Sequence, residues 1–342
     1  MLQLSEVVPV MAHKRIGTCP IRVAREIALR QVGGMSTAMI WYIVKRLIYA
    51  VLTMFLISVI TFALMKLVPG GPFLSEKAPS AATTAALEKK YGLDQPPVKQ
   101  YMTYMKDALK GDFGPSIKKR GREVSDIISD GFKVSAKLGG IAILASVLAG
   151  VPLGCIAALR RGKWQDNTIL VVATSGISMP NFITASFLII IFGERLGLTF
   201  GISTAAHYVM PVIALALFPT SYIMRLIRSS MLDVMGQDYI RTARAKGLAQ
   251  PVVLFKHALR NAILPVITYL GPSIAYTLTG SFVVERIFTI PGLGNEFISS
   301  ITNRDYPMIM GTTLFLAALI IFMNVVVDIA YKFVDPRITF SK

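Results

Sequence analysis

The sequence predicts an all-α protein that crosses a membrane six times. Of its 342 residues, 54% are hydrophobic and only 16% are charged, whereas soluble domains usually carry about 25% charged residues. This composition also excludes a disordered chain, a collagen and a disulfide scaffold. Six stretches are long and apolar enough to cross roughly 30 Å of hydrocarbon as helices. They are residues 47–68, 138–159, 167–192, 208–224, 263–284 and 308–331.

Residues 1–38 precede the first apolar run and lack the continuous apolar core of a signal peptide. Six charged residues interrupt them: Lys14, Arg15, Arg22, Arg25, Glu26 and Arg30. They are either a basic cytoplasmic extension or the product of a start codon upstream of the true one, because Met39 stands just before the apolar run. We therefore divide the chain into this extension (1–38), a first transmembrane helix (39–68), an extracytoplasmic helical segment (69–137) and a five-helix core (138–342).

The extracytoplasmic segment has its own helical patterns. Residues 97–111 begin with Pro, end with Gly and place apolar side chains on one face, which predicts a helix. Residues 81–90 lie behind Ser80 and before Gly92, which predicts a second helix. Apolar residues at helical spacing in 121–132 predict an interfacial helix that leads into the second span. We expect this segment to cap a pore or to contact a partner.

The spans differ in how clearly they are marked. The fourth is the least distinct, because it is short and contains Pro211 and Pro219, whose backbone gaps must be satisfied by neighbouring helices or water. Lys66 and Asp328, the charged residues within the six stretches, lie near span ends, where snorkelling to the headgroups explains them. The second span carries a face of small residues, which predicts close helix packing. It comprises Ala142, Ala145, Ser146, Ala149, Gly150 and Gly154.

The net charge is +17, and the distribution of Lys and Arg among the short loops predicts the orientation. Short loops after the second, fourth and sixth spans hold 13 Lys and Arg, and the opposite short loops hold 3. Because cationic loops stay on the cytoplasmic side, both termini are expected to be cytoplasmic. Nucleic-acid binding is disfavoured, since no basic run is interleaved with the aromatic residues that stack on bases.

The sequence contains no motif for chemistry of its own. It has no phosphate-binding G-x-x-x-x-G-K-[ST], no H-E-x-x-H and no G-x-S-x-G, which disfavours a membrane-embedded hydrolase. Cys19, Cys155 and the three histidines lack metal-ligand spacing. Repeated halves and deep carboxylates, which are typical of ion-coupled carriers, are not visible either. We therefore expect no catalytic residue, cofactor or metal on this chain, and an energy source on another subunit.

The cytoplasmic loop 225–262 is the candidate connection to that subunit. Its stretch 238–248 places small residues at positions 243 and 245 among cations, and Gly247 is suited to end a helix in the left-handed conformation. Small side chains permit close approach of another backbone, and Arg and Lys pair with a partner's carboxylates. Spacing alone favours an ordinary amphipathic surface helix with a glycine cap.

Recognisable motifs extend this interpretation. Gly247 is followed by an apolar-x-Pro element that ends at Pro265, and this pattern resembles the cytoplasmic coupling loop of ABC-importer permeases. Thr242-Ala243-Arg244 stands where that family commonly has Glu-Ala-Ala. The form Arg-Thr-Ala-Arg-Ala-Lys-Gly (241–247) resembles the oligopeptide, dipeptide and nickel branch. Further matches are Val-Pro-Gly-Gly-Pro (68–72), Tyr-Gly-Leu-Asp-Gln-Pro (91–96), Gly-Asp-Phe-Gly (111–114) and Glu-Arg-Ile-Phe-Thr-Ile-Pro-Gly-Leu-Gly (285–294).

The resemblance covers about residues 39–342 and implies the type I ABC importer permease fold in a bacterial cell membrane. It implies a second related permease, two cytoplasmic ATPases that carry ATP and Mg, and an extracytoplasmic solute-binding protein as partners. It places ATPase coupling on the following residues: Arg241, Thr242, Ala243, Arg244, Ala245, Lys246, Gly247, Asn261 and Pro265. The implied cargo is peptide, with nickel or another small solute as the alternative within the family and an ion-coupled secondary transporter as the alternative outside it.

Polar residues within the spans are candidates for the translocation path. Asn181 in the third span and Ser273, Tyr276 and Thr277 in the fifth offer amide and hydroxyl groups without a strong charge that would trap a zwitterion. Polar residues in spans also hydrogen-bond neighbouring helices, which is their commoner use. The sequence leaves both roles open for these four residues.

Overall fold

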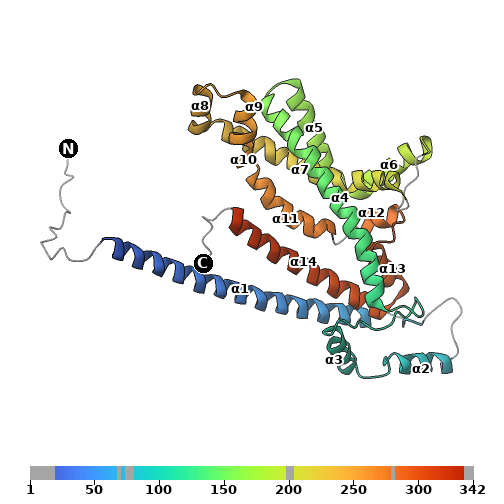
Figure 1. Cartoon of the computed structure of the whole chain (residues 1–342). Coiled ribbons are helices and arrows are strands. Elements are labelled where there is room, and N and C mark those ends of the chain that lie inside the picture. Colours follow the sequence, from blue (N-terminus) through green and yellow to red (C-terminus); the bar gives the residue numbers. More distant parts are fainter. Residues whose placement is uncertain (1–19, 68–70, 74–80, 198–203, 279–281, 335–342) are drawn as a thin grey trace, which may run out of the picture. The chain divides into compact units, whose positions relative to one another are not determined.

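The computed structural model describes residues 20–67, 71–73, 81–197, 204–278 and 282–334, which are mainly helical and contain no β-strand (Figure 1). Residues 1–19 of the extension, residues 68–70 of the first motif and residues 335–342 lie outside the described ranges. The α-helices are α1 (Pro20–Leu67), α2 (Ala81–Lys90), α3 (Pro97–Ala108), α4 (Val124–Leu159), α5 (Trp164–Ser178), α6 (Asn181–Leu188), α7 (Val209–Met235), α8 (Asp238–Ala245), α9 (Gln250–Val252), α10 (Leu259–Ala262), α11 (Leu264–Leu278), α12 (Phe282–Ile287), α13 (Leu293–Asn303) and α14 (Tyr306–Val334).

The chain forms two compact units, and the second contains every site discussed below. The first unit is Met1–Val51 with Ile338–Lys342, of which the described part is the beginning of α1. The second is Leu52–Arg337. Within it, α2 coincides with the predicted helix 81–90, and α3 confirms the helix predicted from residue 97 but ends at Ala108.

Four helices are long and apolar enough to span a membrane, and two bent pairs raise the number to six if each pair is one span. The four are Val44–Leu67, Val124–Leu159, Ala206–Met235 and Tyr306–Val326, and the pairs are Trp164–Ser178 with Asn181–Arg195 and Gln250–Ala262 with Leu264–Ile287. Each predicted apolar stretch overlaps one of these segments. The third stretch is broken rather than straight, since its two helices meet at 106°. Pro180 explains the break, because it holds Met179 in an extended conformation with ψ 119°.

The helix predicted at 121–132 leads into the second span as expected, but its predicted interfacial position is wrong. These residues form the first turns of α4, which runs without a break for 36 residues. Val124, Ile127 and Ile128 are buried in a core with Leu293 and Met308, so protein rather than lipid covers this part of the helix. The amphipathic pattern of these residues therefore results from packing against α13 and α14. From sequence alone, such a pattern looks the same as that of a helix at the membrane surface.

The fourth span, which the sequence marks least clearly, is part of the long helix α7. A short 3₁₀ turn (Ala205–Tyr208) leads into α7, which continues past Pro219 to Met235 and so includes the first part of the predicted loop 225–262. Glycines bring α4 close to α7, because a Cβ atom on Gly154 would lie 2.8 Å from the Cβ atom of Ile227. This contact confirms the predicted small-residue packing face at Gly150 and Gly154.

Candidate functional site

Helix α8 is closed by the glycine that the sequence singles out. Gly247 has φ +72°, the left-handed conformation that favours glycine. Its N–H donates to the carbonyl of Arg244 over 2.9 Å, and the N–H of Leu248 donates to the carbonyl of Ala243 over 3.4 Å. These bonds satisfy carbonyls that the end of a helix otherwise leaves without partners. The turn fixes where the chain leaves α8.

One face of α8 is buried in the protein. Ile240 is 0% exposed and Ala243 is 6% exposed, and both belong to a core with Ile227 and Met231 of α7. The same core includes residues of α10 and of the turn before it. This core connects α8 to α7 through close-packed side chains, and protein interiors resist compression.

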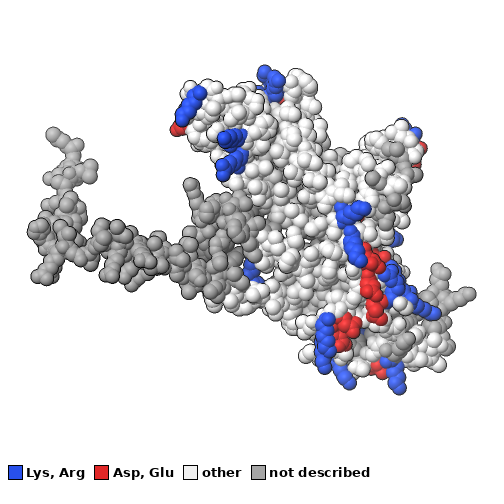
Figure 2. Space-filling model, viewed as in Figure 1, with Lys and Arg blue, Asp and Glu red and all other residues white. Residues whose placement is uncertain are grey.

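The opposite face of α8 is exposed and basic. Among the predicted coupling residues it carries Arg241, Thr242, Arg244, Ala245, Lys246 and Gly247. The Arg241–Asp238 ion pair, at 3.6 Å with both side chains exposed, is too weak to neutralise this face. Figure 2 shows several basic side chains around the α8 region with one small acidic patch beside them. Such a face suits an acidic partner surface.

The remaining predicted coupling residues have different surroundings. Ala243 lies in the core beneath the exposed face, so a partner cannot touch its side chain directly. The Asn261 amide donates a 2.7 Å hydrogen bond to the Tyr239 hydroxyl and so ties α10 to α8. Pro265 is half-buried in the first turn of α11. The predicted coupling residues thus divide into an exposed face on α8 and residues that are buried or bonded behind it.

A buried ion pair, which the sequence analysis missed, joins α5 to α7 in the region of the cationic loops. The Arg228 guanidinium donates to both carboxylate oxygens of Asp166, over 2.6 and 2.9 Å. Gly162 N–H donates to the same carboxylate over 2.9 Å. The Asp166 side chain is 2% exposed and that of Arg228 is 23% exposed. Nothing in the sequence pairs two residues 62 positions apart, so the contact depends on the tertiary fold.

Replacing Asp166 with Asn is expected to lower the free energy of unfolding by about 2–4 kcal/mol, because it leaves a largely desolvated guanidinium without its counter-charge. Thermal unfolding in detergent micelles measures the loss. Asp130→Asn is the matched control, since its ion pair with Arg122 at 2.7 Å is exposed at 59% and 47%, and such pairs contribute about 1 kcal/mol or less. Equal effects of the two substitutions would show that burial does not strengthen the Asp166 pair.

The four predicted path residues line one cavity of about 230 Å³. Asn181 comes from the start of α6, and Ser273, Tyr276 and Thr277 come from α11. Ser273 and Thr277 are buried, whereas Tyr276 is 72% exposed. The Thr277 hydroxyl donates to the carbonyl of Ser273 over 2.7 Å, so it already serves its own helix.

Aromatic residues of the same cavity were missed by the sequence analysis. Phe218 and Tyr269 also line it, and Tyr222 packs on Tyr269 with ring centroids 4.4 Å apart. In an apolar span, aromatic residues at helical spacing are indistinguishable from core residues, so no sequence signal marked them. The cavity combines aromatic faces with amide and hydroxyl groups, which suits a polar but uncharged contact with a solute.

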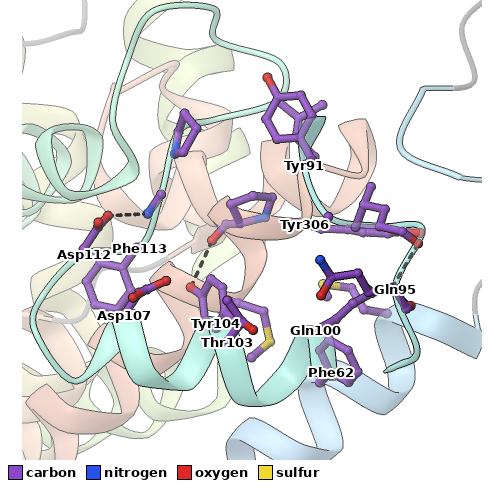
Figure 3. Close-up of a pocket in the computed structure, with 18 of the residues that line it drawn as sticks. Phe62, Tyr91, Gln95, Gln100, Thr103, Tyr104, Asp107, Asp112, Phe113 and Tyr306 are labelled. Carbon is purple, nitrogen blue, oxygen red and sulfur yellow. Dashed lines mark hydrogen bonds between the residues drawn. The ribbon is translucent and has the colours of Figure 1, made fainter. Parts of the chain in front are cut away.

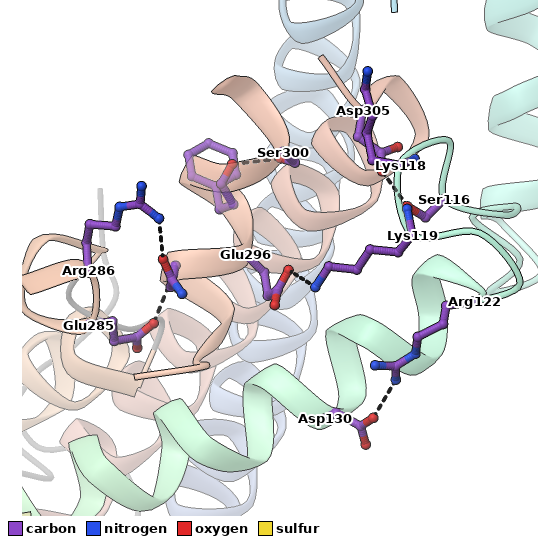
Figure 4. A network of polar contacts seen from close by, with 12 residues as sticks. Ser116, Lys118, Lys119, Arg122, Asp130, Glu285, Arg286, Glu296, Ser300 and Asp305 are labelled. Atoms are coloured by element: carbon purple, nitrogen blue, oxygen red, sulfur yellow. Dashed lines mark hydrogen bonds and ion pairs between the residues drawn. The ribbon is translucent and has the colours of Figure 1, made fainter. Parts of the chain in front are cut away.

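A second missed site is Glu285, which lies just after the predicted fifth span. It is 0% exposed and accepts a 2.6 Å hydrogen bond from the Ser135 hydroxyl. It also accepts the N–H of Asn295 over 3.0 Å; Figure 4 shows Glu285 beside Arg286. The Ser135 oxygen in turn accepts the N–H of Leu293 over 2.9 Å. Together they satisfy the first N–H groups of α13, which no side chain of that helix caps.

This arrangement explains the Pro-Gly-Leu-Gly motif at 291–294. A Cβ atom on Gly294 would lie 2.6 Å from the ring of Phe282 and 2.9 Å from the Glu285 carboxylate, and one on Gly292 would overlap Glu285 and Ser135. Both positions therefore require glycine. A charged residue at the end of an apolar run was the signal that could have identified Glu285.

Comparison with known proteins identifies the family. The model described as "Binding-protein-dependent transport system inner membrane component" matches residues 150–340, and the model of the corresponding N-terminal part matches residues 39–130. The chain is 49% identical over 304 residues to the dipeptide transport system permease protein DppB of Bacillus subtilis (strain 168), covering 88% of this chain and 98% of that one.

Two further comparisons agree. The oligopeptide transport system permease protein OppB of Haemophilus influenzae is 40% identical over 88% of this chain and 100% of its own length. The permease in an inward-facing structure of the MetNI methionine ABC transporter matches 61% of this chain and 96% of its own, with a TM-score of 0.52 and 16% identity, which shows the fold alone. The predicted all-α type I importer permease fold is thereby confirmed, and the chain belongs to the family of binding-protein-dependent transport system inner membrane components.

Proposed function

We propose that this chain is a transmembrane permease subunit of an ATP-driven importer of peptides. The observation that carries the proposal is its 49% identity to a dipeptide permease over 98% of that protein's length. The glutathione permease GsiC of Shigella flexneri, named for a tripeptide, is 37% identical over 100% of its length. These relatives favour peptide over nickel or another small solute, and their membership of ABC systems disfavours an ion-coupled carrier.

The chain forms half of the translocation path and depends on partners for energy. We expect a second related permease, two cytoplasmic ATPases that bind ATP and Mg, and an extracytoplasmic solute-binding protein. The basic face of α8 docks in an acidic cleft of one ATPase, and ATP-driven closure of the ATPases displaces α8. This is an allosteric transition, since the ATPases bind nucleotide differently in the two states.

The core behind α8 carries that displacement to the helices that line the cavity. Ile240 and Ala243 share one buried core with Ile227 and Met231 of α7, and Phe218 of α7 lines the cavity together with Asn181, Ser273 and Tyr276. One rigid helix thus joins the docking face to the candidate path. The same proposal places α8 and both termini on the cytoplasmic side of the bacterial membrane.

Uptake of a labelled dipeptide by cells tests the function. Cells that lack the gene are expected to lose uptake, and the wild-type chain, expressed with its ATPases and binding protein, is expected to restore it. Uptake should stop when ATP is depleted and persist when proton and sodium gradients are collapsed with ATP maintained. Restored uptake of nickel without peptide would support the alternative cargo, and uptake that follows the ion gradients would refute ATP-driven import.

A further inference from the structure

A cavity with an aromatic wall lies apart from the path residues, among α1, α3 and the first turn of α14. It has a volume of about 390 Å³, within the range of small-molecule sites. Figure 3 shows Phe62, Tyr104, Phe113 and Tyr306 around it, with Asp107 and Asp112 on one side. All of its lining residues belong to the second unit. Nothing in the proposed coupling mechanism uses this cavity.

Hydrogen bonds hold the walls of the cavity in place. The Gln100 amide donates to the carbonyls of Leu93 and Gln95 over 2.9 and 2.6 Å, which fixes the loop after α2. The hydroxyls of Ser58 and Tyr101 lie 2.7 Å apart and fasten α3 to α1. Burial raises the pKa of Tyr104, so its hydroxyl stays protonated. The hydroxyl donates a hydrogen bond to the carbonyl of Pro307 over 3.4 Å. A site with fixed walls loses little entropy on binding.

Opposite charges line the cavity without neutralising each other. The Lys66 ammonium lies 5.8 Å from the ring centre of Tyr306 and 5.7 Å from that of Phe62. Among the residues that the structure describes, Lys66 has no carboxylate within 4.0 Å, and Asp107 likewise has no cation within that distance. The Lys66 ammonium feels the charge of the Glu88 carboxylate only from beyond ion-pair distance, and Asp107 makes no ion pair. Both side chains are half-buried, so together they suit a ligand that carries both charges.

We propose that this cavity binds a short zwitterionic peptide at the extracytoplasmic mouth of the permease. Asp107 pairs with the ammonium of the peptide, Lys66 pairs with its carboxylate, and the aromatic wall contacts its side chains. The proposal rests on the proposed function and adds a waiting site outside the path, where peptide is held before the path opens. Phosphatidylethanolamine presents the same two charges, so the test must separate the two ligands.

Titration of the purified full chain in nanodiscs with the dipeptide Ala–Phe tests the site by calorimetry. Binding is expected to weaken about tenfold or more in Lys66→Met and in Asp107→Asn, because each removes a charge-assisted hydrogen bond. Lys66→Arg keeps the charge and is expected to bind within a few-fold of wild type. Lys110→Met and Asp126→Asn change exposed charges outside the cavity and should leave binding unchanged.

The decisive comparison uses the same dipeptide with an acetylated N-terminus and an amidated C-terminus. Equal binding of the free and capped forms, or binding that ignores both Lys66→Met and Asp107→Asn, overturns the proposal. Dipeptide binding in phosphatidylglycerol discs that disappears when phosphatidylethanolamine is included assigns the cavity to the lipid headgroup and also overturns it. ATP-dependent peptide uptake with no binding to this cavity would refute the waiting site while the proposed function stands.

Discussion

Gly247→Asp is expected to reduce ATP-dependent peptide uptake by at least about tenfold. The substitution places a carboxylate on the exposed basic face of α8, where the proposed partner surface is acidic, and like charges brought together cost several kcal/mol. The structure has open space at this position, since nothing lies within 4 Å of a Cβ atom there. The loss should therefore come from docking and not from a clash within the chain.

Gly247→Asn is the matched control for this experiment. Asparagine has the shape of aspartate without the charge, and it is the residue that best tolerates the left-handed conformation after glycine. Uptake, ATPase stimulation and co-purification of the ATPases should be lost in the Asp variant and largely kept in the Asn variant, while both unfold at similar temperatures. Normal co-purification and normal uptake in Gly247→Asp would refute the assignment of α8 as the coupling helix.

The sequence predicted the local features of this structure and missed the tertiary ones. Apolar length located every span, and the Gly247 helix end and α2 lie where local rules place them. Sequence patterns misled where one pattern fits two environments. The apolar face of the first turns of α4 fits both a membrane surface and a protein core, and in the structure it packs against protein. Local rules also placed the end of the fifth span one residue before Glu285, so a buried carboxylate was treated as part of a loop.

For the candidate sites too, local features could be predicted from the sequence and tertiary contacts could not. The exposed cations of α8 could be predicted because helix periodicity and charge are local properties. The shared cavity of Asn181 and Tyr276 could only be suggested, because their distance depends on the bend at Pro180 and on the packing of α11. The Asp166–Arg228 pair and the pairing of Ser135 with Glu285 join residues far apart in the chain, which no single sequence reveals.

Two adjacent glycines of α4 allow the helix packing to be tested by a single methyl group. A Cβ atom on Gly139 would lie 2.6 Å from the carbonyl oxygen of Thr277 and 3.0 Å from its carbonyl carbon, both backbone atoms of α11. A Cβ atom on Gly140 would have nothing within 4 Å. Gly139→Ala must therefore push α4 and α11 apart, whereas Gly140→Ala has room.

Gly139→Ala is expected to lower the free energy of unfolding by about 1–3 kcal/mol, the usual cost of overpacking. Gly140→Ala is expected to be neutral or to stabilise by up to about 1 kcal/mol, because alanine favours a helix more than glycine does. Since α11 also carries Ser273 and Tyr276 of the cavity, uptake should fall in the first variant and persist in the second. Thermal unfolding in micelles and dipeptide uptake measure the two effects. Equal stability of the two variants would show that α4 and α11 do not approach as closely in the membrane, and the position of the cavity wall would then have to be revised.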